Sequence, residues 1–168
     1  MTKTYYHFTP GKIWPILRKE GIVPQPLKSF HKDMHLMCDD LEVDHFGIYI
    51  WPEVTRKLLR DFFLFKQMHD REVDVGVLLA VEVDPKHLLG SRWLERINDR
   101  TGKVNSLRQT HDLTFTLADG TKRLEHKVDM DVYLVRIPPE SIEPIARIYQ
   151  NIEPLDNSLL AFDLGLTD

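Results

Sequence analysis

The beginning of the chain changes from the period of a strand to the period of a helix within a few residues, and this change constrains the fold most. Polar and bulky side chains alternate from Lys3 to Thr9, as in a half-buried strand. Apolar side chains then recur at helical spacing from Ile13 to Leu17, and Gly21 supplies a helix stop. His7 is therefore expected near the end of a strand, where folds commonly expose a polar group to a ligand.

The rest of the pattern predicts an α+β domain that is richer in strand than in helix and has its helices near the N-terminus. Strands are expected over 47–51, 75–83, 113–117, 122–128, 132–137 and 145–148. The Asp119-Gly120 pair favours a hairpin. A helix is expected to begin at Pro52 and to run through Phe65. Residues 24–43 and 86–105 lack a sustained period, so we expect loops there with at most a short helical turn.

Length and composition exclude several classes of protein. A chain of 168 residues, 42% of them hydrophobic, is expected to form one globular domain over residues 1–168. No apolar run approaches the roughly 18 residues of a membrane helix, and no secretory signal is visible, so no membrane partner and a cytoplasmic location are expected. Cys38 is the single cysteine, which excludes an internal disulfide. The net charge of −4 argues against a large non-specific nucleic-acid surface.

Three separated motifs together resemble the ADP-ribosyltransferase superfamily. They are Tyr6-His7-Phe8-Thr9 with the helix that ends at Gly21, then Gly47-Ile48-Tyr49-Ile50, and later Val132-Tyr133-Leu134-Val135 leading to Ile137-Pro138-Pro139. The chain is most similar to the branch of poly-ADP-ribose polymerases and DarT-type DNA-modifying toxins, which carries a histidine, a tyrosine and a glutamate on three strands. The resemblance covers most of the chain. It implies a split fold of mostly antiparallel β-sheets with N-terminal helices.

The resemblance also implies that the chain binds NAD, as a substrate, and needs no metal. His7 is then expected to hydrogen-bond a ribose hydroxyl of the adenosine half, with the backbone at Phe8 holding the nicotinamide amide. Thr9 would add a hydroxyl contact, and Tyr49 would pack its ring against the nicotinamide. One phenylalanine of the following helix would supply a second aromatic wall: Phe62, Phe63 or Phe65. The acceptor would be a macromolecule, either protein or nucleic acid.

A carboxylate is expected at the third position, because loss of nicotinamide passes through a transition state with oxocarbenium character. By resemblance, Asp131 stands where the family has glutamate, and it is one methylene shorter. Asp129 and Glu125 compete with it. Asp129 shares the side of Asp131 in an extended strand, whereas Glu125 needs a shift of register. We predict Asp131 as the catalytic carboxylate, followed by Glu125.

A metal site is the competing interpretation of residues 31–45. His31 and His35 are four residues apart, and further potential ligands follow: Cys38, Asp40, Asp44 and His45. This spacing aligns two imidazoles only in a helix, and the segment has a weak helical pattern and no paired cysteines. We therefore expect these histidines to lie in a solvated loop.

Each predicted site residue also has a structural interpretation. His7 could satisfy a backbone carbonyl, Tyr49 could be a core residue with a solvated hydroxyl, and Asp131 could be a charge at a strand edge. A catalytically inactive module that binds nucleotide, nucleic acid or protein is therefore a second functional hypothesis. An enzyme similar to RNA 2′-phosphotransferases ranks lower, because that family places arginine beside the first histidine, where Tyr6 stands here.

Overall fold

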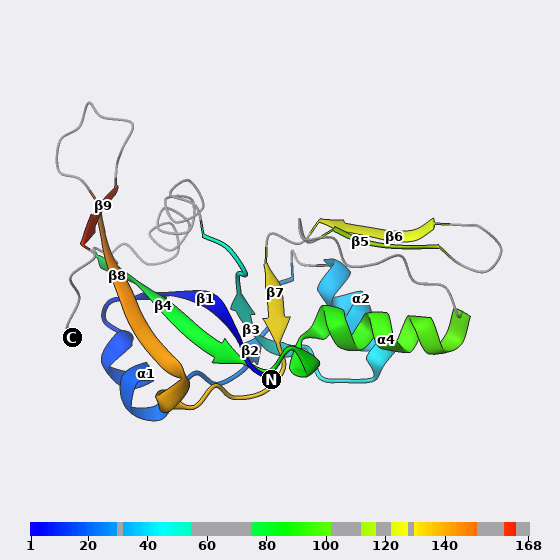
Figure 1. Cartoon of the computed structure of the whole chain (residues 1–168), viewed down its shortest axis with the longest axis horizontal. Coiled ribbons are helices and arrows are strands. Elements are labelled where there is room, and N and C mark those ends of the chain that lie inside the picture. Colours follow the sequence, from blue (N-terminus) through cyan, green and yellow to red (C-terminus); the bar gives the residue numbers. More distant parts are fainter. Residues whose placement is uncertain are drawn as a thin grey trace. The chain divides into compact units, whose positions relative to one another are not determined.

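The computed structural model describes residues 1–29, 32–54, 75–101, 112–116, 122–127, 130–150 and 160–163. These residues form helices and antiparallel sheets, which confirms the α+β class (Figure 1). The chain divides into two compact units, each made of three segments. The β1 unit consists of Thr4–Ile22, Glu53–Val83 and Ile137–Asp168, and the β3 unit of Met1–Lys3, Val23–Pro52 and Asp84–Arg136. The prediction of one domain over the whole chain stays a prediction.

The β1 unit contains a four-stranded sheet (Figure 1). Its strand order is β1 (Lys3–Pro10), β4 (Val75–Val83), β8 (Ile142–Gln150) and β9 (Leu160–Asp163). Strands β4 and β8 are antiparallel, with Leu78 opposite Ala146. These two residues are buried together with Phe8 and Ile148, and the four side chains form a hydrophobic core on one face of the sheet. The strands predicted at 3–9 and 75–83 are confirmed, whereas β8 is longer than the predicted 145–148.

Helix α1 (Trp14–Glu20) follows β1 as the sequence predicts. Pro15 lies in its first turn, where the missing N–H costs nothing. The helix ends at Gly21, whose φ of 81° is a conformation that side chains other than glycine rarely adopt. A Cβ at this position would also overlap the carbonyl oxygen of Ile137. The next residue, Ile22, exchanges two backbone hydrogen bonds of 2.9 Å with Ile137, so the close approach at Gly21 is what lets the two segments pair.

The β3 unit contains a second sheet, in the order β2 (Gln25–Pro26), β3 (Phe46–Ile50) and β7 (Asp131–Tyr133). Both strand pairs are antiparallel. A hairpin of β5 (Asp112–Thr116) and β6 (Lys122–Lys127) belongs to the same unit and confirms the predicted pairing. The predicted turn at 118–121 lies outside the described residues. Strand β7 is shorter than the predicted 132–137, because Ile137 pairs with Ile22 instead of continuing it.

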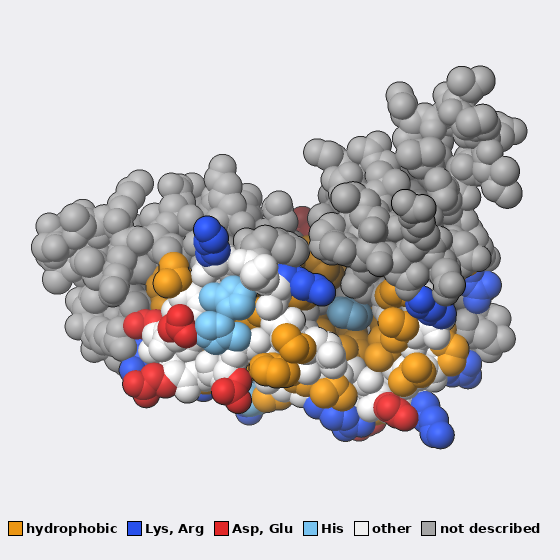
Figure 2. Space-filling model, turned by 180° about the vertical axis from the view of Figure 1, so that it is seen from behind, with side chains coloured by type: hydrophobic (Ala, Val, Ile, Leu, Met, Phe, Trp, Pro, Cys, Tyr) orange, Lys and Arg blue, Asp and Glu red, His pale blue; other side chains and the backbone are white. Residues whose placement is uncertain are grey.

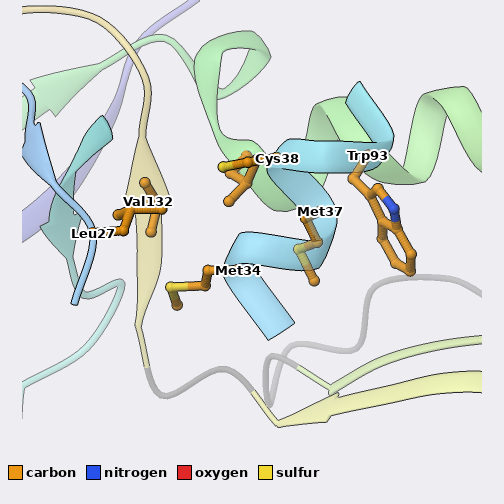
Figure 3. Packing of buried hydrophobic residues seen from close by; sticks show 7 residues of the cluster. Leu27, Met34, Met37, Cys38, Trp93 and Val132 are labelled. Carbon is orange, nitrogen blue, oxygen red and sulfur yellow. The ribbon is translucent and has the colours of Figure 1, made fainter. Parts of the chain in front are cut away.

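Helix α2 (Lys32–Leu41) corrects the prediction of a loop over residues 24–43. Its apolar stripe has the helical spacing i, i+3, i+4, i+7 and consists of Met34, Met37, Cys38 and Leu41. The side chains of Met34, Met37 and Cys38 pack into a core cluster with Leu27 and Val132 (Figure 3). Two methionines and a cysteine therefore make the buried face of α2, and the polar residues between them obscured the helical period in the sequence.

Helix α4 (Leu89–Thr101) corrects the prediction of a polar loop within residues 86–105, and it shows that the helices are not confined to the N-terminal region. The short 3₁₀-helix η1 (Pro85–His87) precedes it, and a second one, η2 (Pro139–Ser141), precedes β8. Leu89 and Trp93, one turn apart, bury α4 against the core cluster of α2. Among the described side chains of α4, Leu89 and Trp93 carry this packing. The helix predicted from Pro52 lies outside the described residues beyond residue 54.

Candidate functional site

His7 lies on β1 in the β1 unit and is partly buried. The next side chain, Phe8, is only 4% exposed and belongs to the core with Leu78 and Ile148. Thr9 is 3% exposed, and its hydroxyl faces the carbonyl oxygen of Pro10 at 3.5 Å. The strand therefore commits the Phe8 side chain to packing.

Tyr49 lies on β3 in the β3 unit, beside the core cluster that contains Val132. Its hydroxyl accepts a hydrogen bond of 2.9 Å from the backbone N–H of Lys28. Burial raises the pKa of the Tyr49 hydroxyl, and the Lys28 N–H partly offsets this effect. The phenol is thus neutral, fixed at its tip and packed along its ring, which is the form an aromatic wall requires.

Asp131 begins β7 and faces the first turn of α4. One carboxylate oxygen, Oδ1, accepts hydrogen bonds from the backbone N–H of Val132 at 2.7 Å and of Gly90 at 3.4 Å. Burial raises the pKa of this carboxyl to about 6, and the two N–H groups only partly offset the loss of hydration. The Asp131 carboxylate is thus partly buried and bonded to the backbone.

The path of the chain before α4 explains the contact between Asp131 and Gly90. Leu88 forms a β-bridge with Tyr133, and the N–H of Leu134 donates to the carbonyl oxygen of His87 at 3.0 Å. Residues 87–90 thus run along the free edge of β7, and the first turn of α4 reaches the carboxylate. A carboxylate at a helix N-terminus satisfies an N–H that has no partner within the helix.

Tyr49 and Asp131 lie on neighbouring strands but on opposite faces of them. In the antiparallel pair of β3 and β7, Tyr49 is opposite Val132, and Ile50 is opposite Asp131. Residues directly opposite each other share a face, and consecutive residues alternate between faces. The structure therefore places the phenol ring on the face covered by α2 and α4. The Cβ atom of Asp131 lies on the other face of the strands.

The remaining predicted site residues are placed less fully. Glu125 lies on β6, opposite Thr114 of β5. Phe62, with Phe63, Phe65 and Asp129, lies outside the described residues. His7, Phe8 and Thr9 belong to the β1 unit, whereas Tyr49, Asp131 and Glu125 belong to the β3 unit.

A polar cluster in the β3 unit was not predicted as a site. His35 and Asp39 are one turn apart on α2, and both connect to His45, which precedes β3. The expectation of loop histidines is wrong for His35, because it lies on a helix. The i, i+4 spacing of His35 and Asp39 was the signal that could have found the cluster, had the helix been recognised.

Among the described residues, no group of three or more histidine, cysteine, aspartate and glutamate side chains is arranged to hold a metal ion. The described helices include none with the length and apolarity needed to cross a membrane. No model of a protein family and no curated protein sequence matches the chain.

Proposed function

We propose that the chain is an NAD-dependent mono-ADP-ribosyltransferase that modifies a macromolecular acceptor, either protein or nucleic acid. The order of the three motifs along the sequence supports the proposal. The strongest structural support is the pairing of β3 with β7, because it makes the strands of Tyr49 and Asp131 neighbours although they are far apart in the sequence. The confirmed strand, helix and glycine stop around His7 are further support.

The proposed reaction breaks the bond between the ribose C1′ and the nicotinamide nitrogen. The bonding electrons go to the nicotinamide ring and neutralise its positive charge. An oxygen or nitrogen of the acceptor then bonds to C1′ and loses its proton. A carboxylate beside the ribose stabilises the cationic transition state. Asp131, with a pKa of about 6, is ionised at neutral pH and is therefore in the required form. Glu125 is the alternative carboxylate.

Isothermal titration with NAD tests the binding half of the proposal. We expect wild-type protein to bind NAD, and His7→Ala to weaken binding by about 10-fold, the effect of losing one hydrogen bond to a ribose hydroxyl. Tyr49→Phe should bind more weakly too, because the ring loses its anchor to Lys28. Tyr133→Phe is the matched control, since Tyr133 lies on the neighbouring strand and the opposite face. No binding of NAD, ADP-ribose or nicotinamide at millimolar ligand would contradict the proposal.

A second candidate function is a module that binds a nucleotide without transferring it. The geometry of Asp131 favours this candidate, because its carboxylate already accepts two backbone N–H groups and starts from the face opposite Tyr49. Chromatographic assay of nicotinamide separates the two functions. A transferase releases nicotinamide from NAD, and Asp131→Asn or Glu125→Gln abolishes the release. A binding module holds NAD or ADP-ribose and releases none.

A further inference from the structure

A continuous chain of hydrogen bonds links α2 to the residues before β3, and the proposed function does not use it. His35 Nδ1 and His45 Nδ1 are 2.6 Å apart. The second nitrogen of each ring has its own partner: His35 Nε2 is 2.8 Å from the carbonyl oxygen of Lys28, and His45 Nε2 is 2.6 Å from Asp39 Oδ1. Histidine side chains lie side by side, near acidic ones, on the face drawn in Figure 2.

The partners of the two rings determine how many hydrogens the rings carry. A carbonyl oxygen and a carboxylate oxygen only accept hydrogen bonds, so His35 Nε2 and His45 Nε2 must both donate. The two Nδ1 atoms at 2.6 Å can share one hydrogen, which one ring donates and the other accepts. The two rings therefore carry three hydrogens, whereas two neutral imidazoles carry two. The pair holds one positive charge, next to the negative charge of Asp39.

No other number of hydrogens fits these distances. With two hydrogens, either the two Nδ1 lone pairs face each other, or the lone pair of a ring Nε2 faces the Lys28 carbonyl oxygen or the Asp39 carboxylate. With four hydrogens, two N–H groups point at each other across 2.6 Å. Each alternative replaces an attraction with a repulsion. We propose that His35 and His45 bind a single proton between their Nδ1 atoms, and that this proton fastens His45, which precedes β3, to α2.

A metal ion is the competing occupant, because metal-bound histidines also donate their second ring nitrogen to a carbonyl or a carboxylate. The distance favours the proton. Two imidazole nitrogens on a tetrahedral zinc ion, each bonded at about 2.0–2.1 Å, lie about 3.3 Å apart. The observed 2.6 Å is shorter, and the described residues assemble no third ligand.

The surrounding charges are compatible with one shared positive charge. Asp39 on α2 contacts His45 directly. Cys38 and Tyr49 are neutral near pH 7, because burial raises the pKa of the Cys38 thiol to about 11 and that of the Tyr49 hydroxyl above its usual value. The other described charged side chains on α2, its C-terminal turn and α4 are Lys32, Asp40, Glu42, Asp44, Arg92, Glu95 and Arg96. Asp39 is thus the group that stabilises the shared proton.

The shared proton fixes the His35 ring and, through that ring, the backbone of residue 28. The backbone N–H of Lys28 donates to the Tyr49 hydroxyl, and its carbonyl oxygen accepts from His35. The N–H of the preceding residue, Leu27, donates to the carbonyl oxygen of His45 at 2.9 Å. Loss of the proton breaks the hydrogen bond between the two Nδ1 atoms. The His35 ring that bonds to the Lys28 carbonyl oxygen is then no longer fixed by His45. The inference rests on these contacts alone and does not depend on the binding of NAD.

Long-range ¹H–¹⁵N correlation spectra of the histidine rings, recorded from about pH 5 to pH 9, test the inference on the full chain. We expect three ring hydrogens on the pair at about pH 6, and a loss of one proton that changes His35 and His45 at the same pH. Asp39→Asn keeps an acceptor for His45 but removes the charge, so it should move this step to lower pH. His87, which packs on Tyr133, is the control, and its ring signals should be the same in both proteins.

Two outcomes overturn the inference. One is independent titration of the two rings, or two hydrogens in all at about pH 6, and the wild-type spectra suffice to detect either. The other is stoichiometric binding of zinc to the full chain that His35→Gln and His45→Gln both abolish. If Asp39→Asn does not fold, His45→Gln replaces it, and the His35 step must then move to a different pH.

Discussion

The ionised Asp131 carboxyl that the proposed chemistry requires lowers the stability of the fold. The pKa of its carboxyl is about 6 in the fold against 3.8 for an unperturbed aspartate, because the carboxylate is partly removed from water. Its contribution to stability is therefore complete below pH 3.8 and is lost as the pH rises through about 6. At neutral pH the protein keeps an ionised carboxylate where a neutral group would be more stable.

Asp131→Asn should accordingly raise the free energy of unfolding at pH 8 by on the order of 2 kcal/mol, and should change it little at pH 4. Urea denaturation at the two pH values measures the difference. Asp84→Asn is the matched control with the opposite sign, because the Lys86 backbone N–H and ammonium hold the pKa of Asp84 below its usual range. An Asp131→Asn effect that is destabilising, or equal at both pH values, would contradict this account of the carboxyl.

The strand position of single residues was more predictable than the orientation of their side chains. The sequence indicates His7, Tyr49 and Asp131 as a set, and each lies on a strand. Which face Asp131 starts from depends on its register with Ile50, a residue far away in the sequence. A shift by one residue would reverse the face, and no local pattern specifies a pairing between distant strands.

At the scale of elements, the C-terminus of α2 contains an unfavourable residue that can be improved. Glu42 has a φ of 57°, in the left-handed region. The N–H of Val43 donates to the carbonyl oxygen of Cys38 at 3.0 Å, and that of Glu42 to Asp39 at 3.1 Å, the pattern in which helices usually place glycine. Glu42→Gly should therefore raise the free energy of unfolding by about 0.5–1 kcal/mol, as measured by urea denaturation. Glu42→Ala, which keeps a Cβ, is the control, and an equal gain from it would contradict the explanation.

The pairing of β3 with β7 depends on a small residue at position 47. A Cβ on Gly47 would overlap the side chain of Val132 on the shared face. Gly47→Ala should thus cost about 1–3 kcal/mol of stability through overpacking, and Val132→Ala about 2 kcal/mol through a cavity. The double variant should cost less than the sum by 0.5 kcal/mol or more. Val132→Ala makes room for the added methyl group, and Gly47→Ala fills part of the cavity that Val132→Ala leaves. Additive costs would show that the two residues do not compete for this space.

Elements with a clear period were predictable, and those whose packing rests on few or unusual residues were not. The alternation in β1 and the apolar run of β4 sufficed for both strands. Helix α2 was missed because Met34, Met37 and Cys38, mixed with charged residues, make a weak pattern until the helix is known. Helix α4 was missed because the residues that separate Leu89 from Trp93, which both pack into the core cluster, are Gly90, Ser91 and Arg92, a composition typical of a polar loop.

At the scale of the whole molecule, each compact unit is built from three separate segments of the chain. Neither unit can be produced by cutting the chain at one point, so every functional test needs the full chain. The resemblance in the sequence implies a reaction, and the structure confirms the α+β class. The proposed transfer of ADP-ribose therefore has to be tested by a chemical assay.

Transfer of label from NAD to an acceptor provides this assay. The full chain is incubated with NAD labelled in its adenylate phosphate and with cell lysate, and label is measured separately on protein and on nucleic acid. We predict covalent label on one of the two classes, reduced about 10-fold or more by His7→Ala and by Asp131→Asn, with Asp84→Asn unchanged. No label on either class from wild-type protein that binds NAD, or equal label from His7→Ala, Asp131→Asn and Glu125→Gln, would contradict the claim.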